Sequence, residues 1–171
     1  MTDARSPVRS GRRHRVECRP ADTAEELDTH FRIRHEVFVE EQELFGGTDV
    51  DGHDAEPGVV HVLAFLNDEP VGTVRLFPLP VDAGDRLWQG DRLAVVRSAR
   101  IHGLGRPLVR FAVATAGERG GREMVAHIQL QNVALFERLG WHKDGDVEVY
   151  VGVHHQPMAI DLQRVRRSSV A

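Results

Sequence analysis

A glycine-containing segment in the middle of the chain has the residue types of an anion-binding turn. It reads Arg100-Ile101-His102-Gly103-Leu104-Gly105, and Arg106 follows it. Apolar residues then recur at helical spacing from Leu104 onward, so the turn opens a helix. The N-terminus of a helix presents free backbone N–H groups and the positive end of its dipole, which together suit phosphate. Glycine lets the backbone approach such a ligand without a Cβ in the way, and the flanking arginines add positive charge.

The residues around this turn exclude one common class of phosphate site and disfavour another. A Walker A loop needs a lysine followed by Ser or Thr, and the only lysine of this chain is Lys143, far from the turn. A dinucleotide fingerprint needs a third glycine, where this sequence has Leu108. The pattern taken alone also fits an ordinary helix cap.

The elements that must position this turn form a β-α-β unit between two β-hairpins. A strand at 88–96 enters the turn, and the helix after it stops at Gly120-Gly121 before a strand at 124–129. This order predicts an α/β (α+β) fold with a central, mixed, twisted sheet of about six to seven strands and about four helices. The other expected elements are a strand at 14–19, a helix from 22 to 38, a helical turn at 39–45, strands at 60–66 and 71–79 joined by a turn at 67–70, a helix at 132–139, strands at 147–153 and 157–162, and loops at 46–58 and 81–86.

Size and composition set the broad class of the protein. The chain has 171 residues and a formal net charge of −4, which argues against binding of nucleic acid by phosphate neutralisation. Cys18 is the single cysteine, so the expected compartment is the cytoplasm. No apolar run is long enough for a membrane span, and no residue spacing matches a metal site. We expect a basic disordered tail at 1–13, one domain at 14–163 and a flexible tail at 164–171.

Two stretches of the sequence resemble the two main motifs of the GNAT N-acetyltransferases. Leu93-Ala94-Val95 followed by the Arg100–Gly105 turn resembles motif A, and 132–141 (NVALFERLGW) resembles motif B. The likeness extends outward over roughly residues 25–163. Within it, the residues around Val37–Gln42 resemble the ElaA-like branch, while 129–133 and 154–162 are similar to nitrogen-starvation-associated N-acetyltransferases.

The resemblance implies the GNAT fold, acetyl-CoA as co-substrate and transfer of its acetyl group by direct attack of a primary amine. The amine would belong to a small molecule or a peptide. In this family the backbone at Leu93, Ala94 and Val95 pairs with the pantetheine arm, and the N–H of Val95 polarises the thioester carbonyl. The resemblance further implies that residues from Arg100 to Arg106 cradle the pyrophosphate, and that Asn132 and Phe136 line the sulfur end.

The catalytic acid and base are less directly indicated. Many family members carry Tyr where this chain has Phe136, and Tyr150, the only tyrosine, is a candidate to replace it as the acid. A CoA thiolate can also leave unassisted, because a free thiol has a pKa of about 8.5. Glu41 is the first choice as general base, and His61, His154 and His155 are further candidates. The acidic residues at 40–56 either attract a cationic amine or form a solvated loop.

Other interpretations stay open on the sequence alone. The stretch 37–54, with His61 and Arg75, also resembles acyl-homoserine-lactone synthases. A GNAT-shaped domain that binds acyl-CoA as a sensor or scaffold, without transfer, is a second alternative. A homodimer is a further option for the assembly.

Overall fold

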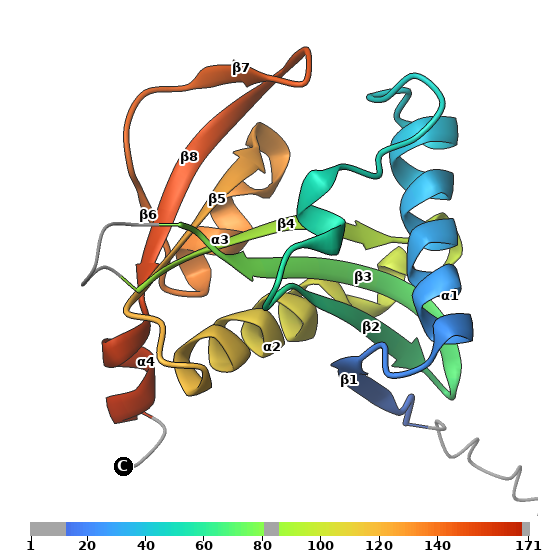
Figure 1. Cartoon of the computed structure of the whole chain (residues 1–171), viewed down its shortest axis with the longest axis horizontal. Helices are drawn as coiled ribbons and strands as arrows, with labels where there is room; N and C mark the ends of the chain where they lie inside the picture. Colours follow the sequence, from blue (N-terminus) through green and yellow to red (C-terminus); the bar gives the residue numbers. More distant parts are fainter. Residues whose placement is uncertain (1–12, 81–85, 169–171) are drawn as a thin grey trace, which may run out of the picture.

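The computed structural model describes residues 13–80 and 86–168, and these form one mixed sheet covered by helices (Figure 1). The sheet has eight strands in the order β1-β2-β3-β4-β5-β8-β6, with β7 also paired to β8. Only the β4–β5 pair is parallel. The strands are β1 (Val16–Pro20), β2 (Val60–Leu66), β3 (Glu69–Pro78), β4 (Leu87–Val95), β5 (Glu123–Gln129), β6 (His142–Lys143), β7 (Glu148–Tyr150) and β8 (Val153–Asp161). The expected mixed α/β architecture is confirmed. The sheet has six longer strands, and the short strands β6 and β7 bring the number to eight.

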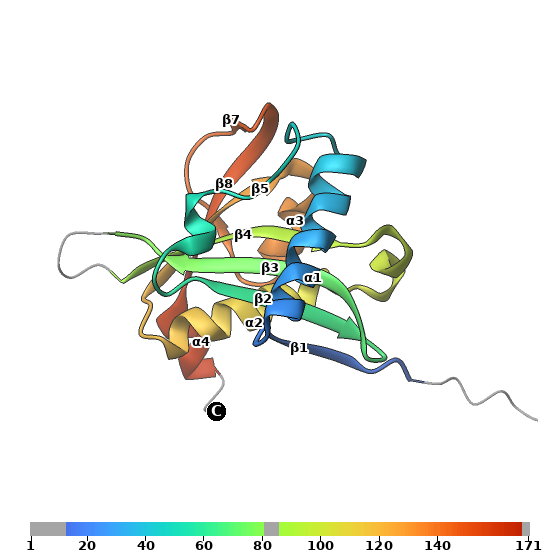
Figure 2. The same cartoon turned by 45° about the vertical axis from the view of Figure 1, so that its right-hand side comes forward.

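Two helices cover opposite faces of β2–β4. The α1 helix (Ala24–Arg34) packs Ile33 against Leu63, whereas α2 (Gly105–Glu118) packs Leu108 and Ala112 into the core that holds Val62. Because neighbouring residues of a strand point to opposite faces, Val62 and Leu63 place the two helices on opposite sides, as Figure 2 shows. The remaining helices are α3 (Val133–Arg138), α4 (Leu162–Ser168), a π-helical segment η1 (His35–Glu41) and the 3₁₀ segments η2 (Gly52–Ala55), η3 (Arg97–His102) and η4 (Leu130–Asn132).

The first helix begins where the sequence predicts and ends earlier. Thr23 caps α1, because its hydroxyl accepts a hydrogen bond from the N–H of Glu26 (3.1 Å). The α-helix ends at Arg34 rather than at residue 38. The chain continues in the wider turns of η1, in which the N–H of Gln42 donates to the carbonyl of Val37. Short π-helical segments are frequent at functional sites, and this one carries Val37 and Phe38, which line the two cavities described below.

The hairpin between β2 and β3 is tighter than expected. Asn67 and Asp68 both have positive φ, which is the two-residue turn that matches the twist of a β-hairpin. The loop expected at 81–86 and the tail expected at 1–13 lie outside the described residues, apart from Arg13 and Arg86. In the part of the chain that the structure covers, no helix has the length and apolar character of a membrane span.

A β-bulge interrupts β4 at Arg92. Thr73 pairs with Ala94 and Arg75 with Asp91, so two residues of β4 stand opposite the single residue Val74 of β3. Arg92 adopts a φ of 52°, which is rare for a residue with a side chain and costs about 1–3 kcal/mol. A bulge of this kind bends its strand and ends regular pairing, and bulges are frequent beside active sites.

The parallel pair β4–β5 opens into a cleft immediately before this bulge. The two strands pair only over Leu87–Gln89 and Glu123–Val125. Beyond these residues β4 stays with β3, whereas β5 follows β8, and the two halves of the sheet diverge in Figure 1. The cleft therefore lies between the C-terminal halves of two adjacent strands and leads to the N-terminus of α2.

The C-terminal part differs from the sequence prediction in two ways. Strand β8 runs unbroken through Pro157. The carbonyl of Pro157 accepts from the N–H of Asp144, so this residue directs its backbone toward the gap between β6 and β7. A proline lacks only its N–H, which that gap leaves without a strand partner. The residues from 164, expected to be a flexible tail, are helical through Ser168, and α4 buries Leu162 in the core.

Candidate functional site

The N-terminus of α2 has the features of an anion site. Gly103 takes the left-handed conformation (φ 67°), and no side chain caps the first turn of α2. Pro107 lies in that turn, where a missing N–H is tolerated. The free N–H groups at the start of the helix therefore face outward, together with its dipole.

A groove begins at this helix end and follows the edge of β4. The expected cofactor residues that line it are Leu93, Ala94, Val95, Arg100, Gly103, Leu104, Gly105, Arg106 and Asn132. Ile101 and His102 do not line it, although both belong to the predicted turn. The 3₁₀ turn η3 directs Ile101 outward, where it is 88% exposed, and the ring of His102 contacts that of His14. Only the glycine half of the predicted turn, with Arg100 and Arg106, therefore borders the groove.

Glu41 lies beside this groove and is engaged in ion pairs. Its two carboxylate oxygens accept from the two terminal nitrogens of Arg100, at 2.6 and 2.7 Å, and Arg97 adds a third contact at 3.3 Å. Hydrogen bonding to Arg100 lowers the pKa of Glu41 below its usual value. A carboxylate held in this way is a weak proton acceptor, and Glu41 lines neither cavity of the site. The structure therefore places the predicted base beside this groove, as a partner of Arg100.

The backbone of β4 presents two residues to the cleft. The N–H of Val96 donates to Val71 of β3, so the alternation of a β-strand turns the N–H and C=O of Val95 toward the cleft. The carbonyl of Val95 accepts from Nε of Arg100 (3.0 Å). Leu93, two residues earlier, presents its backbone to the same side. This is the edge on which the sequence resemblance places the pantetheine arm and the thioester.

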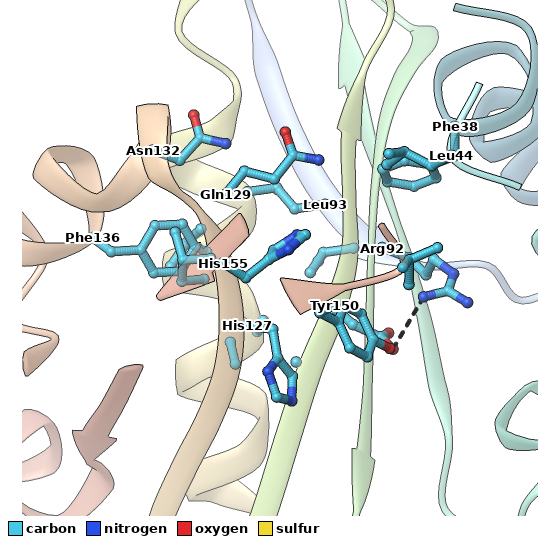
Figure 3. Close-up of a pocket in the computed structure, with 18 of the residues that line it drawn as sticks. Phe38, Leu44, Arg92, Leu93, His127, Gln129, Asn132, Phe136, Tyr150 and His155 are labelled. Carbon is cyan, nitrogen blue, oxygen red and sulfur yellow. Dashed lines mark ion pairs between the residues drawn. The ribbon is translucent and has the colours of Figure 1, made fainter. Parts of the chain in front are cut away.

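A second cavity adjoins the groove and collects polar side chains at its mouth (Figure 3). The two cavities share Gln42, Leu93, Gln129 and Asn132. His155 on β8 pairs with Gln129 of β5 on one side and with Glu148 of β7 on the other. Paired residues and those two positions along share one face of a sheet, so His155, Gln129, Glu148, His127 and Tyr150 project from the same face.

His155 has the clearest geometry of a proton acceptor. Its side chain is buried, and its Nδ1 lies 2.8 Å from the carbonyl oxygen of Val153. A carbonyl can only accept, so Nδ1 carries the proton and Nε2 carries the free lone pair. Among the described residues Nε2 has no hydrogen-bond partner, and the imidazole lies in the middle of the cavity residues in Figure 3.

Tyr150 and Phe136 line the same cavity at different depths. The ring of Tyr150 stacks on His127 (centroids 4.6 Å apart, planes at 7°) and meets the edge of His155 at 5.4 Å. Nδ1 of His127 lies 2.5 Å from a carboxylate oxygen of Glu148. Phe136 is buried against Trp141 (5.2 Å), so it supplies an apolar wall and no proton.

The acidic loop expected at 40–56 is an internal anchor. Asp49, Asp51 and Asp54 pair with arginines from other elements instead of facing solvent. Arg34 and Arg75 are fully buried, and Arg92 nearly so. The pairs are Arg34–Asp49 (2.7 Å), Arg34–Asp54 (2.6 Å), Arg75–Asp51 (2.6 Å), Arg75–Asp91 (2.7 Å), Arg92–Asp49 (3.0 Å) and Arg92–Asp51 (3.0 Å). These three aspartates are therefore not available to attract a cationic acceptor, whereas Glu40 and Glu43 of the same loop are exposed.

The charges of this cluster depend on one another. Burial opposes ionisation of Asp54, but hydrogen bonds from His61 and Arg34 outweigh it and hold the pKa of Asp54 well below its ordinary range. His61, a predicted base candidate, is thus occupied by Asp54 at 3.1 Å. Removing one partner from a buried ion pair costs about 3–5 kcal/mol, because the other charge stays buried. The cluster fixes the loop and the bulge at Arg92 together.

Sequence reasoning missed several residues of the site. Gln42, Gln129 and His127 line the cavities but match no motif with a stated role. The alternation of β5 was a usable signal, since it places His127 and Gln129 on the same face. No local pattern could have shown that Arg92 reaches Asp49, which lies 43 positions away.

Comparison with known proteins agrees with this geometry. The model of the acetyltransferase (GNAT) family matches residues 20–141. A Bacillus subtilis (strain 168) protein that carries the name acetyltransferase BSU40680 is 30% identical to this chain over 132 residues. The match covers 77% of this chain and 86% of that protein. Escherichia coli ElaA has a similar fold (TM-score 0.74, 21% identity, 86% of this chain and 99% of ElaA covered). An acyl-CoA N-acyltransferase from Pseudomonas aeruginosa gives a TM-score of 0.72 at 26% identity, over 85% of this chain and 99% of its own. The chain, with its open β4–β5 pair and the glycine turn at α2, belongs to the GNAT acetyltransferase family.

Proposed function

We propose that this protein transfers an acyl group from a CoA thioester to a primary amine, with acetyl-CoA as the simplest donor, and that His155 is the general base. The acceptor would be a small molecule or a peptide. The observation that carries the proposal is Nε2 of His155, which has no partner among residues 13–80 and 86–168 and lines a cavity that shares four residues with the groove at α2.

The groove would hold the donor. The N–H groups of Leu104 and Gly105 suit the pyrophosphate, Arg106 adds charge, and the cleft edge at Leu93 and Val95 suits the pantetheine amides. CoA bound in this way brings its thioester to the junction of the two cavities, near Asn132. The N–H of Val95 would then donate to the carbonyl oxygen as negative charge develops on it.

The transfer is a direct attack in a ternary complex. The amine nitrogen forms a bond to the thioester carbon, and Nε2 of His155 takes the proton that the nitrogen loses. The C–S bond breaks as the tetrahedral intermediate collapses, and CoA leaves as the thiolate. Tyr150 is the candidate to return a proton to the sulfur, since Phe136 has none to give. The buried hydrogen bond from Nδ1 to Val153 holds the ring of His155 in the required tautomer.

The sequence supports two finer assignments. The residues around Val37–Gln42 favour the ElaA-like branch, and the stretch 154–162 favours the nitrogen-starvation-associated group. With Cys18 as the only cysteine, a reducing cytoplasm is the compartment we propose.

The proposal is tested by thiol release from acetyl-CoA over a panel of primary amines. His155→Gln should lower kcat about 10²–10⁴-fold and leave the KM for acetyl-CoA unchanged, because a general base contributes about this factor. His154→Gln is the matched control, since His154 is the neighbouring residue and is exposed on the opposite face.

Two results would refute the assignment. Equal rates for His155→Gln and the wild type would remove His155 as the base. Tight binding of acetyl-CoA without release of thiol to any amine would favour the alternative of a non-catalytic sensor.

A further inference from the structure

The inner part of the second cavity is apolar, and no residue of its wall takes part in the proposed reaction. The second cavity as a whole is about 130 Å³ in volume, and its inner part reaches α2, where Val109 and Ala112 line it. Its deep wall consists of buried apolar residues from four elements and the loop after α3: Gly90, Val109, Ala112, Met124, Phe136 and Trp141. An acetyl group, with its single methyl, would leave most of this space unfilled.

Two positions on the cavity wall carry small residues. Gly90 is buried in β4, and its missing side chain makes room for Met124, whose terminal methyl lies 2.5 Å from where a Cβ would stand. Ala112 faces the cavity from α2, one helical turn after Leu108 in the core. The splay of β4 and β5 supplies the opening, since the strands no longer pair beyond Gln89 and Val125.

We propose that this inner cavity binds the acyl chain of the donor, and that the protein prefers a CoA thioester with a linear chain of about four to six carbons to acetyl-CoA. This inference rests on the proposed function. An apolar cavity of about 150 Å³ accommodates benzene, so the second cavity, at about 130 Å³ in all, has room for a chain of this length.

The position of the cavity favours the donor over the acceptor as its occupant. The deep wall lies toward α2, which also provides the pyrophosphate site, and the shared residues Leu93 and Asn132 mark where the thioester would sit. A chain that continues from the thioester carbonyl enters the cavity directly. The amine must meet Nε2 of His155, and His155 lies with Tyr150 and His127 at the polar mouth.

The test is calorimetric binding of straight-chain acyl-CoAs from acetyl to decanoyl, measured without an acceptor. Each buried methylene is worth about 0.8 kcal/mol, which is about a fourfold gain in affinity. We expect hexanoyl-CoA to bind at least tenfold more tightly than acetyl-CoA, and affinity to level off or fall beyond about six carbons. Equal affinity for acetyl- and hexanoyl-CoA would overturn the inference.

Two variants and a control locate the effect. Ala112→Leu should fill the cavity and lower the affinity for hexanoyl-CoA at least tenfold, with acetyl-CoA unaffected. Val109→Ala should enlarge the cavity and move the optimum to a longer chain. The matched control is Val113→Ala, on the same helix and equally buried but outside the cavity.

The outcomes separate this inference from the proposed function. A chain-length optimum that Val109→Ala moves and Val113→Ala does not would support the acyl site even if no amine were acylated. If Val109→Ala changes the preference among amines and leaves the chain-length profile unchanged, the cavity holds the acceptor and the inference is wrong. Val109→Ala only removes atoms and introduces no clash. The inference can therefore be tested with this variant even if Ala112→Leu does not fold.

Discussion

His30 should make the folded state sensitive to pH between 7 and 5. Its side chain is fully buried, its Nε2 faces the carbonyl of Val74 at 3.4 Å, and its Nδ1 has no partner among the described residues. Burial, together with the nearby His61 and Arg34, lowers the pKa of His30 to about 3. In the unfolded chain a histidine has a pKa of about 6.5. The folded state therefore keeps His30 neutral at a pH where the unfolded state binds a proton.

The sign and the size of the effect follow from this difference. The contribution of His30 to stability is complete above a pH of about 6.5 and falls as the pH drops toward 3, because only the unfolded state gains a proton there. With a full proton of difference, each pH unit below about 6.5 costs about 1.4 kcal/mol. Between pH 7 and 5 the loss in the free energy of unfolding should be about 2 kcal/mol.

The assay compares urea unfolding of the wild type and of His30→Leu at pH 7 and pH 5. The variant should lose about 2 kcal/mol less than the wild type over this interval, whatever its absolute stability. His142→Leu is the control, because His142 is exposed on β6, and its pH dependence should match the wild type. Equal pH dependence for His30→Leu and the wild type would show that His30 is protonated in the folded state and would refute the reasoning.

Two further predictions concern the cofactor groove. Glu41→Gln should leave the acidic limb of the pH–rate profile in place, because Glu41 pairs with Arg100 and does not face the acceptor; loss of that limb would restore Glu41 as the base. Gly103→Val should weaken acetyl-CoA binding at least tenfold in calorimetry, since a branched side chain at a φ of 67° is strained and crowds the anion site. Gly47→Val is the control, because Gly47 also has a positive φ (90°) and open space around it, and it lies in a loop outside both cavities. Unchanged affinity for acetyl-CoA in folded Gly103→Val would contradict the proposed site.

Local patterns explain which parts of the molecule the sequence could predict. The spacing of Leu104, Leu108 and Ala112 identifies α2, and Gly103 marks its start, because helix periodicity and left-handed turns depend on near neighbours. The Asn67-Asp68 turn and the Thr23 cap are local in the same sense. These features place the groove at the start of α2, and the resemblance to the family motifs is the basis for the ligand proposed for it.

Long-range contacts explain what the sequence could not predict. Glu41 meets Arg100 across 59 positions, and that pairing changes a candidate base into a partner of a groove arginine. The outward direction of Ile101 depends on η3 being a 3₁₀ turn, which the glycine pattern does not specify. Asp49, Asp51 and Asp54 look solvated in the sequence because their arginines come from α1, β3 and β4.

The buried Arg–Asp cluster gives the strained bulge in β4 a physical basis. A φ of 52° at Arg92 persists only if its surroundings fix it, and the guanidinium is bound by Asp49 and Asp51 and lies 4.8 Å from the centre of the Phe45 ring. Phe45 lines the cavity, and Leu93 is the next residue along the strand. The cluster thus ties the loop, the bulge and the cavity wall into one unit. Replacing a buried ion cluster by packed apolar residues is often neutral or stabilising, but the cluster fixes the backbone of β4 at the edge proposed to hold the thioester.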